Sequence, residues 1–112
     1  MIKKNYKGQC KKLSLSKCQT VVRTYNDIQY AYASILENDN SIKEFQCNIS
    51  LDDSEYTSDF LCIKTDNDYM IRECVNREYL TKPRTVKLLD ESREYWLRHG
   101  ITDWGIIINE EK

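Results

Sequence analysis

Two apolar segments, residues 56–64 and 69–75, are separated by an Asp-Asn-Asp turn at 66–68. Short apolar runs on either side of such a turn predict a β-hairpin, which pairs two neighbouring strands antiparallel. Each run contains one acidic residue, Asp59 in the first and Glu73 in the second. Pairing across the hairpin brings such residues together. We therefore expect the two carboxyl groups to lie near enough to share one ion.

A helix and a strand are predicted before the hairpin. Apolar residues recur at helical spacing after Thr24, which together with Asp27 resembles a capping box. Turn residues at 38–40 end this helix. Apolar and polar residues then alternate over 45–51, a pattern typical of a half-buried strand.

A second helix and a last strand are predicted after the hairpin. Pro83 suits the first turn of a helix, and Gly100 stands where a left-handed C-terminal cap belongs. The apolar run at 104–108 predicts a strand that is buried on both faces. We expect one side of the second helix to be formed by Val86, Leu89, Arg93, Trp96 and Leu97.

The order helix, three strands, helix, strand predicts an α+β fold. A mixed four-stranded sheet would be flanked by two helices, and the last crossover would be right-handed. The expected core contains Ile35, Leu36, Phe60, Ile71, Leu89, Trp96, Ile106 and Ile107.

Length and charge limit the possible functions. The 112 residues predict one domain at 24–112, preceded by a basic arm at 1–23. Lys and Arg number 17 against 18 Asp and Glu, so binding to nucleic acid would need a local basic patch. The arm is either a solvated tail or a segment that contacts phosphates, and both readings remain open.

The cysteines and the N-terminus favour a cytoplasmic protein. No apolar run is long enough to cross a membrane, and no apolar stretch follows the basic first residues as in a secretory signal. The five cysteines include no close pair, which is typical of reduced, buried thiols. The sequence contains no Cys-x-x-Cys knuckle, which is the spacing that would indicate a zinc site.

Several short motifs occur in an order found in a known superfamily. The segments are residues 28–32 with Leu36-Glu37, Ser58-Asp59-Phe60-Leu61, Arg72-Glu73-Cys74-Val75, the helix from Lys87 to Trp96, and residues 100–107. In this order they resemble the PD-(D/E)XK nucleases, and in particular the N-terminal endonuclease domain of the transposon subunit TnsA. The resemblance implies a restriction-endonuclease-like core with the order α-β-β-β-α-β.

The resemblance also implies a site. Asp59 and Glu73 would hold Mg²⁺, which takes oxygen ligands and activates water, and no organic cofactor is expected. Gln29 stands where the family's helix often carries a glutamate ligand. Val75 stands in the place of the family's lysine, and Lys87 is the candidate to replace that lysine. Candidate contacts to nucleic acid are Lys11, Lys12, Lys17, Lys82, Arg84 and Lys87.

Three functions follow from this pattern. The first hypothesis is a nuclease-fold protein of a transposon or phage with lost or weakened cleavage, which binds DNA or a transposase-like partner. The second is an active Mg²⁺-dependent DNA endonuclease. The third is a small inhibitor of a host defence complex, which would use the acidic turns at 52–55 and 66–68 to mimic nucleic acid.

Overall fold

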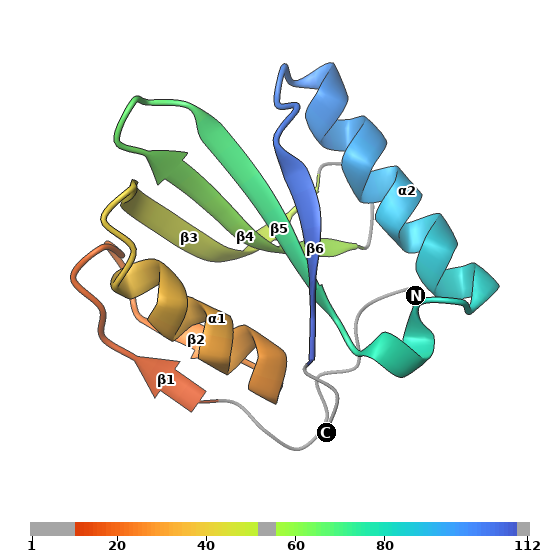
Figure 1. Cartoon of the computed structure of the whole chain (residues 1–112), viewed down its shortest axis with the longest axis horizontal. Helices are drawn as coiled ribbons and strands as arrows, with labels where there is room; N and C mark the ends of the chain where they lie inside the picture. The colour runs from red at the N-terminus through yellow and green to blue at the C-terminus, as the bar shows by residue number, and fades with distance from the viewer. Residues whose placement is uncertain (1–10, 52–55, 110–112) are drawn as a thin grey trace.

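The structure, a computed structural model, describes residues 11–51 and 56–109 and has an α+β architecture (Figure 1). Within these residues, neither helix is long and apolar enough to cross a membrane. The elements are β1 (Lys11–Leu13), β2 (Val22–Thr24), α1 (Asp27–Glu37), β3 (Ile42–Ser50), β4 (Thr57–Lys64), β5 (Tyr69–Val75), the 3-10 helix η1 (Arg77–Tyr79), α2 (Pro83–Arg98) and β6 (Trp104–Ile108).

The main sheet is mixed and four-stranded, as predicted. Its strands lie in the order β3-β4-β5-β6, with the first three antiparallel and β6 parallel to β5. Strands β1 and β2 form a separate two-stranded antiparallel sheet, which the sequence patterns did not predict. Figure 1 shows this small sheet beside α1, while α2 runs along the other side of the molecule.

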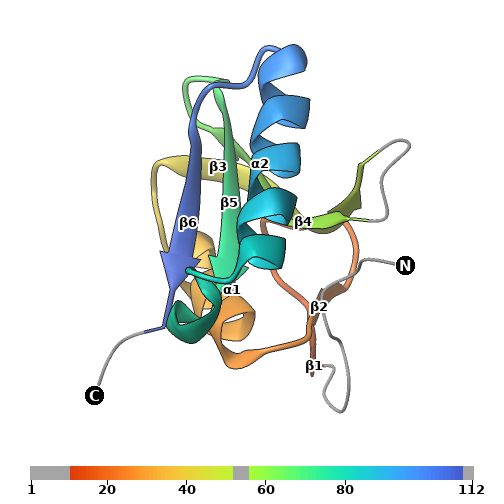
Figure 2. The same cartoon turned by 90° about the vertical axis from the view of Figure 1, so that its right-hand side faces the viewer.

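The two helices cover opposite faces of the main sheet (Figure 2). Along β5, Met70 and Cys74 belong to the apolar cluster that includes Ile28 and Leu36 of α1. Ile71 belongs instead to the cluster around Trp96 of α2. This alternation follows from the two-residue period of a strand, and it divides the core into an α1 side and an α2 side.

The N-cap of helix α1 lies two residues after the residue expected to be the cap. The side chain of Asn26, not that of Thr24, accepts a hydrogen bond from the backbone N–H of Gln29 at 2.8 Å. Thr24 is instead a buried residue of β2. The expected burial of Ile35 is wrong, because α1 turns Leu36 inward and leaves Ile35 57% exposed.

Two further burial predictions are corrected by the position of β6 at the edge of the sheet. Ile106 is 39% exposed and Ile107 is only half-buried. In α2, the inward face is formed by Leu89, Ser92 and Trp96 at helical spacing. The other expected members of this face, Val86, Arg93 and Leu97, are exposed.

Part of the expected basic arm contributes to the core. Val22 is buried, and Leu13, Leu15 and Cys18 pack against the α1-side cluster. The ammonium group of Lys17 donates to the carbonyl oxygens of Leu36 (3.1 Å) and Asp39 (2.6 Å) at the end of α1. A cation in this position satisfies carbonyls that a helix end leaves open. Residues 1–10 lie outside the described residues.

The described cysteines are free thiols: Cys18, Cys47, Cys62 and Cys74. Burial raises the pKa of Cys62 to about 12 and that of Cys18 to about 11, so both thiols stay protonated near neutral pH. Cys10 lies outside the described residues.

The burial pattern gives a matched pair of substitutions. Ile71 is fully buried in β5, whereas Ile106 on the neighbouring strand is largely exposed. We expect Ile71→Ala to lower the free energy of unfolding by about 2–5 kcal/mol, and Ile106→Ala by about 1 kcal/mol or less. Urea denaturation followed by circular dichroism would measure both. Equal losses would show that β6 is as buried as β5.

Candidate functional site

Asp59 and Glu73 are neighbours on β4 and β5, and both are fully buried. The antiparallel pairing of β4 and β5 extends to Phe60 and Arg72, and Asp59 and Glu73 are the next residues on the two strands beyond that pair. The carboxylate of Glu73 accepts a hydrogen bond from the backbone N–H of Asp59 at 3.0 Å. The hairpin therefore places the backbone of Asp59 beside the carboxylate of Glu73.

The carboxylate of Glu73 is held on the α2 side of the sheet. Its Oε1 atom also accepts a hydrogen bond from the hydroxyl of Tyr56 at 2.8 Å. Its Oε2 atom accepts one from the hydroxyl of Ser92, on the inward face of α2, at 2.6 Å. Both carboxylate oxygens are therefore engaged by the chain itself.

A row of hydrogen bonds lies behind Ser92 and leads towards Glu73. The indole N–H of Trp96 donates to the hydroxyl of Ser58 at 3.0 Å. The hydroxyls of Ser58 and Ser92 are 3.3 Å apart, and the indole N–H of Trp104 donates to Ser92 at 3.1 Å. Because Ser92 gives its only proton to Glu73, Ser58 is the donor between the two serines.

The carboxylate of Asp59 has its partners elsewhere. Its Oδ1 atom accepts from the side-chain amide of Gln29 in α1 at 3.2 Å, and its Oδ2 atom accepts from the backbone N–H of Cys74 at 2.7 Å. The same amide group of Gln29 donates to Asn48 at 2.9 Å, and the amide oxygen of Gln29 accepts from the backbone N–H of Tyr25. Gln29 thus joins α1 to three other segments.

A break in strand alternation separates the two carboxylates. Ser58 bonds to the α2 side and Phe60 packs on the α1 side, yet Asp59 between them also bonds to α1. On the adjacent strand, Asn48 has φ +58°, in the left-handed region, between the pairs Cys47–Phe60 and Ile49–Ser58. Asp59 and Glu73 therefore receive their hydrogen bonds on different faces of the sheet.

Among the described residues, no group of three His, Cys, Asp or Glu side chains adds to the metal site expected at Asp59 and Glu73. The amide of Gln29 reaches Asp59, as its place in the motif suggested, but an amide adds no charge to hold a cation. Binding of Mg²⁺ by Asp59 and Glu73 stays a prediction.

Val75 faces a cavity of about 320 Å³ at the end of β5. Glu73 and Val75 share a face of the strand because they are two residues apart. Tyr56, which bonds to Glu73, also lines this cavity, together with residues of η1 and the first turns of α2. A lysine at position 75 would extend into this space.

Two cations of the hairpin, Lys64 and Arg72, are paired with an acidic residue away from Glu73. Lys64 and Arg72 both form ion pairs with Asp103, and the Arg72–Asp103 distance is 2.9 Å. The hydrogen bond from Lys64, assisted by Arg72, holds the pKa of Asp103 below its usual range. The side chain of Arg72 lies over Gly105, where a Cβ atom would come within 3.3 Å of the guanidinium.

Lys87 does not face the site, which corrects the expectation that it replaces the lysine. It lies two residues before the buried Leu89, roughly 200° away around the helix. Its neighbours on the exposed face of α2 include Asp90, Glu91 and Glu94. An acidic surrounding of this kind also weakens its case as a phosphate contact.

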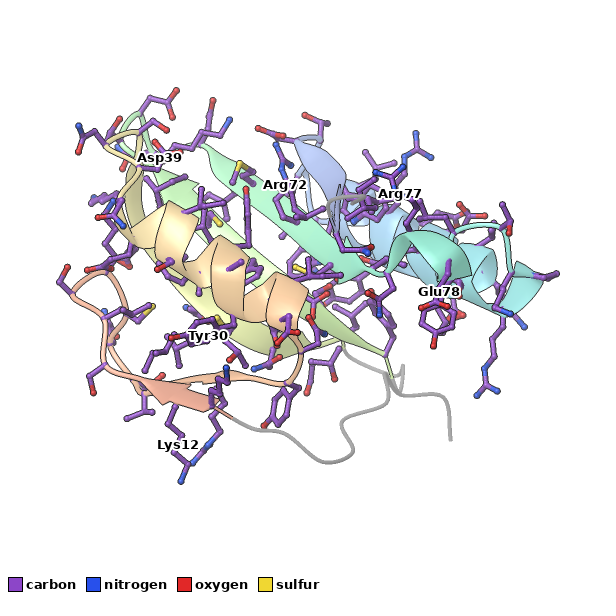
Figure 3. All side chains as sticks on the ribbon, turned by 60° about the horizontal axis from the view of Figure 1, so that its bottom comes forward. Lys12, Tyr30, Asp39, Arg72, Arg77 and Glu78 are labelled. Carbon is purple, nitrogen blue, oxygen red and sulfur yellow. The ribbon has the colours of Figure 1, made fainter. Side chains whose placement is uncertain are left out.

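The remaining candidate cations lie on two exposed regions. Lys82 and Arg84 lie at the start of α2, and Lys11 and Lys12 lie on β1. Figure 3 shows Lys12 extending from β1 away from the body of the molecule, with Tyr30 of α1 nearby. The ammonium of Lys11 lies 4.5 Å from the centre of the Tyr30 ring. The ammonium of Lys17 already donates hydrogen bonds to carbonyl oxygens at the end of α1.

Sequence reasoning missed Arg23, which the register places directly opposite Lys12. Both side chains are exposed. It also missed Tyr56 and Ser92 as partners of Glu73. Ser92 carried a signal, because it is a polar residue three positions after Leu89 and four before Trp96, on the apolar face of the helix.

No family model matches the chain, and no curated protein matches it.

Ser92 tests the role of the buried network. Ser92→Ala removes one hydrogen bond to Glu73 and the acceptor of the Trp104 indole, so we expect a loss of about 1.5–3 kcal/mol in unfolding free energy. Ser34→Ala, on the exposed side of α1, is the control and should change stability by about 0.5 kcal/mol or less. Chemical denaturation measures both. A Ser92 variant as stable as the control would show that the network is dispensable.

Proposed function

We propose that this protein is a TnsA-like, PD-(D/E)XK-type protein of a mobile genetic element that binds nucleic acid without cutting it. The α+β fold with a mixed sheet is compatible with such a core. In this proposal, the buried carboxylates of Asp59 and Glu73 stabilise the fold, and exposed cations bind the nucleic acid.

The proposed loss of cleavage is supported by the hydrogen bonds that the carboxylates of Asp59 and Glu73 accept within the protein. Both are buried, and hydroxyl, amide and backbone N–H groups of the chain already occupy all four of their oxygen atoms. A metal would compete with these donors for the lone pairs of the carboxylate oxygens, and each hydrogen bond to a buried charged group that it breaks costs about 1.5–3 kcal/mol. Val75 supplies no cation to the position next to the site.

The cation pair on the small sheet supports binding of a polyanion. Lys12 and Arg23 stand directly opposite each other on β1 and β2. Like charges in this position repel and destabilise a sheet. A phosphate group placed between them would convert this repulsion into attraction. Lysine and arginine contacts to phosphates dominate the affinity of nucleic-acid-binding proteins.

The inhibitor hypothesis has weaker support. Asp66 and Asp68 are exposed in the turn between β4 and β5, but the carboxylate of Asp66 accepts a hydrogen bond from the backbone N–H of Asp68 at 2.9 Å. This contact is the usual reason for aspartate in a turn. The other acidic segment, 52–55, lies outside the described residues.

Incubation with supercoiled DNA tests cleavage. We expect no metal-dependent nicking by the wild-type protein in Mg²⁺ or Mn²⁺, because loss of one aimed cation commonly lowers the rate on the order of a hundredfold or more. Val75→Lys returns a cation to the cavity, and nicking by this variant alone would show that the carboxylates still accept a metal. Robust cutting by the wild type that Glu73→Gln abolishes, with the fold retained by circular dichroism, would refute the proposal.

Binding is tested by the salt dependence of DNA affinity. Lys12→Ala should weaken binding and reduce the slope of log K against log salt by about 1, because about one phosphate contact is lost. Lys87→Ala, which removes an equally exposed lysine from an acidic surrounding, should leave the slope unchanged. Fluorescence anisotropy over a salt series measures both. Equal slopes for the wild type and both variants would show that Lys12 on β1 does not contact the nucleic acid.

A further inference from the structure

Five segments of the chain meet around the cavity beside Val75. It opens between the start of α1, the residue before β4, the end of β5, η1 and the first turns of α2, around a volume of about 320 Å³. A volume near 300 Å³ is at the lower end of the range for small-ligand sites.

The lining has a consistent chemistry. Among the described residues that line it, Arg84 is the only Lys, Arg, Asp or Glu, and this lining favours an anionic group over a cation. Leu88 and Leu89 form an apolar wall together with Val75. Tyr79 is 43% exposed as a residue, and the ammonium of Lys82 lies 5.8 Å from the centre of its ring. Side-chain amides of Asn26 and Asn76 add polar groups.

We propose that this cavity holds one unpaired nucleotide of a bound strand. The guanidinium of Arg84 binds the phosphate, and the base stacks on Tyr79 against the apolar wall of Leu88 and Val75. This inference rests on the proposed nucleic-acid binding and adds its specificity. Stacking of a base on an aromatic side chain, combined with a cation for the backbone, is the usual way in which single strands are bound.

An unpaired nucleotide fits this cavity better than a duplex does. The apolar wall and the ring of Tyr79 can contact the face of a base only when that base has left its stack. The cation pair of Lys12 and Arg23 lies on the small sheet, where β2 ends two residues before Asn26 of the cavity. In the proposed complex, the strand contacts these exposed cations and its terminal nucleotide enters the cavity.

The experiment compares three labelled DNA probes of one sequence by fluorescence anisotropy: a blunt duplex, the duplex with a short unpaired thymidine overhang, and the single strand. We expect the overhang and the single strand to bind about tenfold more tightly than the blunt duplex. Thymidine monophosphate should compete weakly, because it lacks the contacts to Lys12 and Arg23. Competition as strong as that of the overhang would show that a free nucleotide is the ligand, which would overturn the strand-end proposal.

Variants locate the preference. Tyr79→Ala should abolish the advantage of the overhang, and Tyr79→Phe, which keeps the ring, should retain it. Tyr69→Ala is the matched control, because Tyr69 is similarly exposed at the other end of β5. Arg84→Ala should weaken binding of the overhang more than binding of the blunt duplex.

The outcomes separate the two proposals. Equal, salt-dependent binding of all three probes, unchanged in Tyr79→Ala, would refute the cavity and leave the proposed nucleic-acid binding intact. Failure of every probe to bind at low salt would refute both. An overhang preference that disappears in Tyr79→Ala and persists in Tyr69→Ala would support the cavity.

Discussion

The carboxylate of Glu73 is the interaction on which the arrangement of sheet and second helix depends. A buried carboxylate costs several kcal/mol to desolvate unless hydrogen bonds replace its water. The hydroxyls of Tyr56 and Ser92 and the backbone N–H of Asp59 provide them. Since these donors come from the start of β4, from β4 itself and from α2, the charge fixes the position of α2 on the sheet.

Asp59 makes an equivalent connection to α1. Gln29 reaches it from the first turn of that helix and at the same time holds Asn48 on β3 and the backbone before the helix. The left-handed backbone of Asn48 and the irregular facing of Asp59 belong to one local distortion of the sheet. One carboxylate therefore serves each helix, and the two acidic residues act as two separate structural centres.

Sequence periodicity identified the main strands and both helices because each carries a strong local pattern. The strands at 57–64, 69–75 and 104–108 and the helix at 83–98 are present within about one residue of the expected bounds. Burial of Ile106 was predicted wrongly because an apolar run does not show that a strand lies at an edge. The facing of Asp59 was missed because regular alternation was assumed, and the link from Ser92 to Glu73 depends on packing between residues distant in sequence.

Val75 connects the site to the binding proposals. A lysine here would place its ammonium group in the cavity beside Tyr56, and would reduce the space open to a ligand. Valine leaves the cavity open with an apolar wall, and among the described lining residues the charge is that of Arg84 at the start of α2. Under the proposed function, Val75 therefore lacks a group suited to phosphate chemistry and contributes to a surface suited to a stacked base. On that proposal, the side chain at position 75 decides between cleavage and binding within one fold.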